Sequence, residues 1–475
     1  MSTSDQASDA LDLLRAKLRG PVIAPGQPGY DDARKVWNAM FDDRRPLAVV
    51  RCVDEDDVAA AVRCLRGTGA PIAIRGGGHH IAGFGTCDAG FVIDMGAMRT
   101  VVPVDDGGSR VRVAGGATLH DVDTATDAVG RAVPLGVVSP TGVAGLTLSG
   151  GLGWLTRRHG YTCDNLVSAR VVTAEGEVVV ASERENPELL WALRGGGGNF
   201  GVVTEFEFET HPVGPVAVAE AYYPAEREDE LVQLLRFYRD WTAELPDAVT
   251  AWIMIERASD GHELGADALG KLVVGLLACS LETSGRDRAA LEPMLREGSP
   301  ALTRTTTMSM LDLQHLQDGG SSAATGMHSY MKGEMLTELT DSAIAGIAHH
   351  STQLPTETSL FEMGQLGGAL AQRGELDAAV GLRHTRYLGG FSMMSTDGAN
   401  LDEHIAWTRK AWSSMTDGSA GGVYLNFSGD ESRERVMGSL GAAPDDEKRR
   451  RLVDLKRRYD PDNVFRVNHN IDPGS

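Results

Sequence analysis

The sequence predicts an α+β fold with a first domain over residues 1–211, a second over residues 212–420 and a C-terminal segment over residues 421–475. Three observations predict it. Short strand and helix patterns alternate as far as residue 211. Longer helical patterns, separated by strand-like runs, begin near Pro212. The last part of the chain holds a basic helix, an Asp-Pro turn signal and a strand-like tail.

The first domain opens with a strand–helix–strand pattern. Asp54 is expected to cap a helix over Val58–Leu65, because the acidic residues that follow it favour the positive end of a helix dipole. The next strand, Pro71–Arg75, runs directly into three glycines. Other strands are expected at Leu47–Val53 and Gly90–Met95, and hairpins are expected to pair Thr100–Val104 with Arg110–Ala114 and Ala169–Thr173 with Val178–Ala181.

The second domain is predicted to be a sheet with helices on one side. Its expected helices are Glu226–Leu245 and Asp402–Met415, and its expected strands include Ala251–Glu256, Leu272–Cys279 and Ser359–Gly364. The C-terminal segment is expected to form a helix over Asp445–Tyr459 and a strand-like tail over Val464–Ile471.

Composition excludes several classes of function. The chain carries 45 Lys and Arg against 66 Asp and Glu, a net charge of −21, so we expect neither a nucleic-acid nor an anionic-membrane partner. Its five cysteines form no C-x-x-C pair, which argues against a metal site. No secretory signal is visible in Met1–Gly20 and no run of about 18 apolar residues occurs. We therefore expect a cytoplasmic protein.

Three glycine-rich segments are the candidate chemistry-bearing loops: Arg75–Gly85, Ser149–Gly153 and Gly195–Gly201. Backbone N–H groups in such loops can approach phosphate oxygens closely, although each loop taken alone is also compatible with a simple turn. The third loop has G-x-G-x-x-G spacing. A helix precedes it and a strand follows it, the reverse of the dinucleotide-binding order, so we reject a Rossmann site.

Four ordered motifs resemble the FAD-linked oxidases of the vanillyl-alcohol oxidase type, and especially their berberine-bridge-enzyme-like branch with its bacterial natural-product oxidases. They are Arg75-Gly76-Gly77-Gly78-His79, Ser149–Leu155 with Arg157–Gly160, Leu190–Thr204, and Tyr459–Arg466 with Asn468 and Asn470. The resemblance implies a two-subdomain PCMH-type FAD-binding domain, a substrate domain with an antiparallel sheet, and a C-terminal segment that returns to the FAD domain.

The resemblance further implies that His79 bonds covalently to the flavin, while its neighbour His80 packs nearby. Many relatives carry a second link from a cysteine that opens a C-P-T segment. Here Ser139 stands at that position, so a single link is expected, and Cys163 is not expected to substitute. The other implied cofactor contacts are Arg75, Gly76, Gly77, Gly78, Gly83, Thr141, Gly142, Gly145, Gly150, Gly153, Asn199, Gly201, Val203, Asn468 and Asn470, together with His80 and Ser139.

The catalytic candidates are Tyr424, Asn426 and Glu362. A flavin that accepts hydride needs a neighbouring group to take a proton, and Tyr424 could do so if cationic neighbours lowered its pKa, or it could be an ordinary half-buried strand residue. Asn426 would orient its neighbours. Glu362 suits a base or an amine-binding group, or a solvated strand residue. Further candidates are His328, Tyr330, Arg383, His384 and Tyr387, whereas Met308, Met310, Met327, Met331, Met335, Met393 and Met394 are expected to fill the core.

These expectations imply an oxidase that takes hydride from a C–OH or C–N group of a small molecule and passes the electrons to O2, giving H2O2. In relatives the residue equivalent to Gly142 controls the access of oxygen to the flavin, and Gly142 has no side chain that could block it. Three alternatives stay open: a tailoring enzyme of secondary metabolism that cyclises or oxygenates a natural product, a dehydrogenase with another acceptor, and a flavin-binding protein without turnover.

Overall fold

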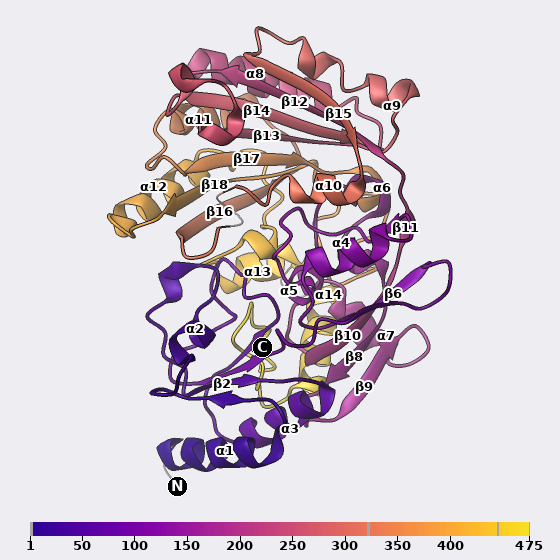
Figure 1. Cartoon of the computed structure of the whole chain (residues 1–475), viewed down its shortest axis with the longest axis vertical. Coiled ribbons are helices and arrows are strands. Elements are labelled where there is room, and N and C mark those ends of the chain that lie inside the picture. The colour runs from indigo at the N-terminus through magenta and orange to yellow at the C-terminus, as the bar shows by residue number, and fades with distance from the viewer. Residues whose placement is uncertain (1–2, 321–323, 444–445, 475) are drawn as a thin grey trace.

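The computed structural model describes residues 3–320, 324–443 and 446–474. Met1 and Ser2 of the predicted N-terminal domain, and Asp445 of the predicted basic helix, lie outside these ranges. The predicted α+β fold is confirmed: a large sheet with its helices occupies one half of the elongated molecule, and a four-stranded sheet, a five-stranded sheet and a two-stranded pair belong to the rest (Figure 1). Within the described residues, no helix has both the length and the hydrophobicity to cross a membrane.

The N-terminal sheet has four strands in the order β1-β2-β4-β3. Strands β2, β4 and β3 run parallel and are almost wholly buried, as expected for strands that are covered on both faces. Asp54 caps α3 by accepting a hydrogen bond from the backbone N–H of Asp57, as predicted. The elements are α1 (Thr3–Lys17), β1 (Val22–Ile23), α2 (Tyr30–Arg34), β2 (Ala48–Arg51), α3 (Glu55–Leu65), β3 (Ile72–Arg75) and β4 (Phe91–Asp94).

The second sheet is antiparallel, with five strands in the order β5-β6-β10-β8-β9, and it contains both predicted hairpins. Its strands are β5 (Val101–Pro103), β6 (Arg110–Ala114), β8 (Leu166–Val172), β9 (Val178–Ser182) and β10 (Val202–Glu209). The helices around it are α4 (Leu119–Asp127), α5 (Val143–Leu148), α6 (Thr156–His159) and α7 (Pro187–Leu193), and β7 (Arg131–Ala132) pairs with β11 (His211–Pro212).

The third sheet is antiparallel, with seven strands in the order β15-β12-β14-β13-β17-β18-β16. These are β12 (Val216–Pro224), β13 (Val249–Arg257), β14 (Leu272–Ser280), β15 (Leu302–Met308), β16 (His328–Leu336), β17 (Leu360–Gln365) and β18 (Tyr387–Ser395). Helices α8 (Glu228–Thr242), α11 (Asp341–Ser351) and α12 (Leu401–Ser413) cover its outer face, while α9 (Gly285–Ala289) and α10 (Met310–His315) connect strands (Figure 1).

The two faces of this sheet have different partners because side chains alternate along a strand. On β13, Ala251, Ile253 and Ile255 pack with the covering helices in one hydrophobic cluster. Their neighbours Trp252 and Met254 point to the opposite face, where they line a cavity. Alternate side chains along the strand therefore face the hydrophobic core on one side of the sheet and the cavity on the other.

The C-terminal segment packs against the second sheet and α7. Its helices α13 (Arg433–Ser439) and α14 (Glu447–Tyr459) share a hydrophobic cluster with those elements. The predicted strand at Val464–Ile471 was wrong, and the expected alternating strand around Tyr424 is instead irregular and ends in a 3-10 turn, Leu425–Phe427. The N–H groups of Val464 and Phe465 need no neighbouring strand as a partner, because the side chain of Asp460 accepts hydrogen bonds from both.

Candidate active site

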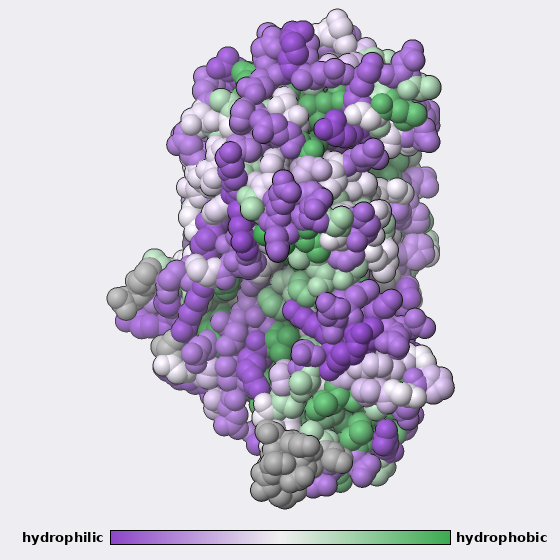
Figure 2. Space-filling view, turned by 90° about the vertical axis from the view of Figure 1, so that its left-hand side faces the viewer, coloured by the Kyte–Doolittle hydropathy of each residue, from purple (hydrophilic) through white to green (hydrophobic). Residues whose placement is uncertain are grey.

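A cavity of about 330 Å³ lies where the three glycine-rich segments, the open face of the large sheet and the C-terminal segment meet. All three glycine-rich segments contribute to its walls, through residues 75–81, 84–85, 149, 152, 196–198 and 201. The large sheet contributes residues of β13, β16, β17 and β18, and the C-terminal segment contributes residues 424–427, 465 and 467–469. A band of hydrophobic residues is visible between the upper and the lower half of the molecule (Figure 2).

The first loop is held against the segment that opens α5 by two glycines. A Cβ on Gly77 would lie 2.3 Å from the backbone nitrogen of Gly142, and a Cβ on Gly142 would lie 2.3 Å from that of Gly77. Glycine is required at both positions because the two backbones touch. The contact between the two backbones therefore explains why residue 142 is a glycine, and this glycine does not indicate whether oxygen can reach the cavity.

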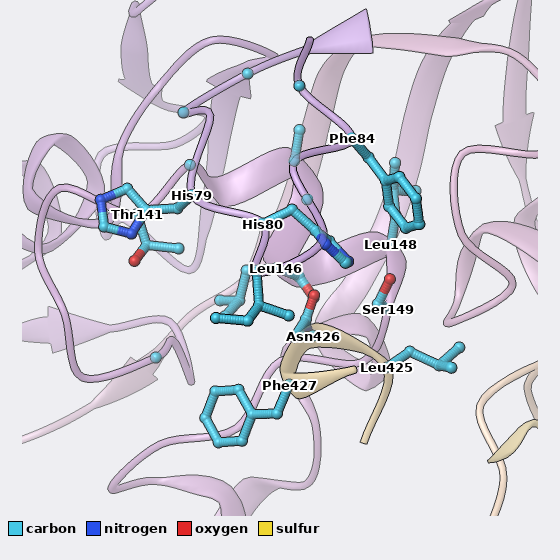
Figure 3. A pocket seen from close by; sticks show the side chains of 18 of the residues that line it. His79, His80, Phe84, Thr141, Leu146, Leu148, Ser149, Leu425, Asn426 and Phe427 are labelled. Atoms are coloured by element: carbon cyan, nitrogen blue, oxygen red, sulfur yellow. The ribbon is translucent and has the colours of Figure 1, made fainter. Parts of the chain in front are cut away.

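His79 sits at one end of the cavity. Its ring stacks on Trp37 with 5.3 Å between the ring centroids, and Figure 3 shows it beside Thr141 and pointing away from His80. Burial in the cavity wall lowers the pKa of His79 to about 4. The imidazole is therefore neutral at pH 7, which is the state in which a ring nitrogen can act as a nucleophile.

His80 faces a different part of the cavity. Its Nδ1 accepts a hydrogen bond from the backbone N–H of Ala82 at 3.0 Å, and its ring lies against Phe84 and His469. Burial lowers the pKa of His80 to about 3 and that of His469 to about 4. The two neighbouring histidines thus occupy separate surroundings, and only His79 faces Trp37.

The structure brings most of the predicted cofactor contacts together and separates a few. Those that line the cavity are Arg75, Gly76, Gly77, Gly78, His79, His80, Thr141, Gly142, Gly145, Gly201, Val203 and Asn468. Those outside the lining set are Gly83, Ser139, Gly150, Gly153, Asn199 and Asn470. The guanidinium of Arg75 is committed to the carboxylate of Asp94 and the carbonyls of Ala33 and Lys35, so it anchors the loop.

Ser139 is buried and its hydroxyl has no hydrogen-bond partner in the described part of the chain. Its N–H donates to Asp318 at 3.0 Å, a contact between the two halves of the molecule. Cys163 is buried in a cluster behind Tyr424, away from the cavity lining, and burial raises the pKa of its thiol. A thiol so placed is unreactive.

Tyr424 lines the cavity but differs from the sequence expectation. Its hydroxyl oxygen accepts hydrogen bonds from the N–H of Gly151 at 3.0 Å and from Nδ2 of Asn426 at 2.9 Å. Burial raises the pKa of Tyr424, although these donors oppose the shift. The lowering by cationic neighbours that a base role would require is not found, because burial dominates and the phenol keeps its proton at neutral pH. Asn426 also donates to the carbonyl of Leu146, so it ties Tyr424 to α5.

Glu362 projects from β17 into the cavity. It lies between Met254 on β13 and Gly390 on β18 in the register of the sheet. No hydrogen-bond or ion-pair partner of its carboxylate is found within the described ranges. The cavity walls shield the group from bulk water, and this burial, with a smaller contribution from Glu256, raises the pKa of Glu362 to about 7. A carboxyl with this pKa can exchange protons at neutral pH.

The other candidates from the sequence lie elsewhere. His328, Tyr330, Arg383, His384 and Tyr387 do not line the cavity. Arg383 makes a buried ion pair with Asp164, and Tyr387 faces the helices over the large sheet. Two methionines assigned to the core, Met331 and Met394, are buried in small hydrophobic clusters as expected, and they also line the cavity. Their strands have one face on the cavity, which the sequence alone did not reveal.

Sequence reasoning missed several lining residues: Trp37, Trp252, Met254, Phe427 and His469. Alternation along β13 could have identified Trp252 and Met254 had the open face been known. Phe427 lies close to β16, where a Cβ on Gly333 would be in ordinary contact with its Cβ at 3.9 Å. Trp37 stands in an irregular segment with no local signal.

A buried lysine, also missed, joins the third loop to the C-terminal tail. Nζ of Lys456 donates to the carbonyls of Asn199 and Phe465, each at 3.0 Å, and to the carboxylate of Asp460 at 2.5 Å. Both partners of this ion pair are fully buried. Asn199 completes the junction by donating to the carbonyl of His469 and accepting from the N–H of Ile471. The tail residues that line the cavity depend on this junction.

Comparison with known proteins identifies the family. Residues 46–182 match the model of an FAD binding domain, and residues 447–472 match the berberine and berberine-like model. The chain is 29% identical over 465 residues to (R)-6-hydroxynicotine oxidase of Paenarthrobacter nicotinovorans, covering 96% of this chain and 97% of that one. This chain is a FAD-linked oxidoreductase of the berberine-like family. A FAD-linked oxidoreductase of Dictyostelium discoideum is also 29% identical, covering 96% and 95% of the two chains.

Solved structures share the fold of this oxidoreductase. The 6-hydroxy-D-nicotine oxidase of Arthrobacter nicotinovorans superposes with a TM-score of 0.84 at 27% identity, covering 96% of this chain and 98% of the other. The glucooligosaccharide oxidase of Acremonium strictum, which carries a 6-S-cysteinyl, 8α-N1-histidyl FAD, has a TM-score of 0.83 at 23% identity, covering 98% and 99%. The latter likeness shows the fold alone.

The cavity of this oxidoreductase fits a dinucleotide cofactor. Glycines of the first and third loops line it, so that backbone N–H groups can approach a bound phosphate without an intervening side chain. The side-chain oxygen of Asn468 is buried at the cavity wall without a hydrogen-bond partner among the described residues, so it is free to accept from a bound molecule.

Proposed function

We propose that this oxidoreductase oxidises a C–OH or C–N group of a small molecule and passes the electrons to O2, giving H2O2. The observation that carries the proposal is Glu362, an unpaired carboxyl in the wall of the cavity that the glycine loops also line, where burial raises its pKa to about 7. Bound FAD would accept the hydride, which carries both electrons. The chain itself must supply a group that takes the substrate proton.

The cofactor would be held by the loop residues 75–80, by Thr141 to Gly145 and by Asn468. We propose one covalent link, at His79. The neutral imidazole and the position at the end of the cavity support this link. A second link is not proposed, since Ser139 has no sulfur and lies outside the cavity lining. The glucooligosaccharide oxidase, with cysteinyl and histidyl bonds, illustrates the two-link case.

Glu362 would act as the general base. As a carboxylate it can accept the proton from the substrate's O–H or N–H as hydride leaves the adjacent carbon. Tyr424 keeps its own proton because burial raises its pKa, so its role is to donate a hydrogen bond and to shape the cavity wall. Asn426 and the N–H of Gly151 fix the position of the Tyr424 oxygen.

The acceptor can be tested without knowing the substrate. The flavin of the holoenzyme would be reduced with dithionite under argon, and the enzyme mixed with dissolved O2 in a stopped-flow instrument. Rapid return of the oxidised flavin spectrum, with one H2O2 formed per flavin, is the expected result. Slow reoxidation by O2 together with fast reduction of a dye would instead make the enzyme a dehydrogenase.

A further inference from the structure

The ring of His79 is oriented by packing and not by hydrogen bonds. Neither of its ring nitrogens has a hydrogen-bond partner in the described part of the chain, and burial is the sole cause of its lowered pKa. Its one ring–ring contact in the same ranges is the stack on Trp37, with 22° between the two planes. The torsion that turns a histidine ring has only broad intrinsic preferences, so a neighbour must set the plane of the ring. The indole of Trp37 is that neighbour.

Trp37 itself is held from several sides. Its backbone N–H donates to the carbonyl of Gly78, the residue before His79, at 3.1 Å. Its indole is buried in a small cluster to which each wall of the cavity contributes one side chain: Ile81 of the first loop, Met331 of β16 and Phe427 of the C-terminal segment. The indole therefore cannot turn away from the imidazole without losing contacts to three separate parts of the chain.

The residue after Trp37 anchors this segment to both halves of the molecule. The amide of Asn38 is fully buried and uses all four of its hydrogen-bonding positions. Its Nδ2 donates to the carbonyls of Ile81 at 2.9 Å and Ser329 at 2.7 Å. Its Oδ1 accepts from the N–H groups of Ser329 at 3.0 Å and Met40 at 3.1 Å. The first glycine loop and β16 thus fix the position of the segment that carries the indole.

We propose that Trp37 is a positioning residue for attachment of the flavin, and that its indole holds the imidazole of His79 in the orientation from which a ring nitrogen bonds to the cofactor. This inference rests on the proposed link at His79. In forming the link, one C–H bond of a flavin methyl group and the imidazole N–H bond break, and one C–N bond forms. The two protons and two electrons pass by way of the flavin to O2, giving H2O2.

The flat face of the indole is the property that matters in this role. Aromatic rings attract one another in offset-stacked geometry, which favours one plane of the imidazole over the others. An aliphatic side chain at position 37 would fill much of the same space and leave the ring of His79 free to turn. Attachment should therefore depend on an aromatic ring at this position, because a reacting group that is held in one orientation reacts faster than one that is free.

Attachment kinetics of the full-length chain test the proposal. Each variant is synthesised in a cell-free extract depleted of flavin, FAD is added in air, and acid-precipitated samples are compared over time for flavin fluorescence in the protein band. Trp37→Leu should form its link about three- to tenfold more slowly than the wild type, the ratio that corresponds to the loss of one aromatic pair. Trp37→Phe keeps a flat ring, so its rate should stay within about twofold of the wild-type rate.

The total flavin that stays with the protein before the acid step separates slow attachment from failed binding. It should match the wild type in both variants at position 37. A Trp37→Leu chain that binds no flavin would show that Trp37 shapes the cavity as a whole, and would overturn the proposal. Equal slowing in Trp37→Phe and Trp37→Leu would also overturn it, because the stacked face would then not be the cause.

Trp241→Leu is the matched control. Trp241 is also buried and stacked, on Phe237 with 5.8 Å between the ring centroids, but it belongs to α8 over the opposite face of the large sheet. This variant should form the link at the wild-type rate, and slowing like that of Trp37→Leu would contradict the proposal. Equal rates in Trp37→Leu and the wild type would overturn this inference alone. A wild-type chain that never gains acid-resistant fluorescence would overturn the link at His79 as well.

Discussion

Replacing Glu362 with Gln is expected to slow the reduction of the flavin by about 10²–10⁴-fold, the usual contribution of a general base, when a substrate of the wild-type enzyme is the reductant. Gln has the same shape but accepts no proton at neutral pH. The wild-type kcat/KM should rise with pH through about 7, because the pKa of Glu362 is raised to that value and only the carboxylate is active. This rise should be absent in Glu362→Gln.

Anaerobic stopped-flow absorbance of the flavin is the appropriate measurement, since it reports the reductive step alone. Flavin content and the unfolding temperature of Glu362→Gln should match those of the wild type, because Glu362 has no partner to lose within the described ranges. A loss of less than tenfold with an unchanged pH profile would remove Glu362 from the role of base.

Tyr424→Phe gives the contrasting result. We expect less than about a tenfold loss in the rate of flavin reduction, because burial keeps the phenol protonated and unable to act as base. The variant should instead be less stable by about 1–3 kcal/mol, since the N–H of Gly151 and the amide of Asn426 lose their acceptor in a buried place. Chemical denaturation measures this loss. A rate loss as large as that of Glu362→Gln would transfer the base role to Tyr424.

The second large effect is expected at Lys456. Lys456→Met should lower the free energy of unfolding by about 3–5 kcal/mol, because it leaves the carboxylate of Asp460 fully buried without its cation. The variant also loses the bonds to Asn199 and Phe465 that hold the third glycine loop against the C-terminal tail. Urea denaturation measures the stability, and the flavin absorbance of purified protein measures how much cofactor is retained.

Arg451→Met on the same helix is the matched control. Arg451 pairs with Glu188 and lies over the ring of Trp191, so this variant should lose no more than about 1–2 kcal/mol, less than Lys456→Met, and keep its flavin. A loss of similar size in both variants would mean that the helix, and not the buried junction of Lys456, determines stability.

The local features of the fold were predictable from the sequence. Asp54 as a helix cap, both hairpins and the strand that runs into Gly76 depend on neighbours in the chain, and their patterns are visible in a short window. The order of helix, loop and strand around Gly195–Gly201, on which the rejection of a Rossmann site rests, was also predicted and is the order in the structure.

Features that depend on distant contacts were not predictable in this way. The tail after Asp460 resembles a strand, but its N–H groups bond to one carboxylate and one amide. Met331 and Met394 resemble core residues because the sequence does not show which face of their sheet is open. The direction of the pKa shift of Tyr424 depends on burial by segments far away in the chain, so it could not be derived from the residues next to Tyr424.

The attachment of the cofactor is the central claim, and one measurement tests it most directly. Purified wild-type protein would be denatured in acid, separated on a denaturing gel and examined for flavin fluorescence in the protein band. We expect fluorescence in the wild type and in His80→Ala, and none in His79→Ala, because only the His79 ring lies at the Trp37 end of the cavity. A wild-type band without fluorescence, or a fluorescent His79→Ala band, would contradict the account.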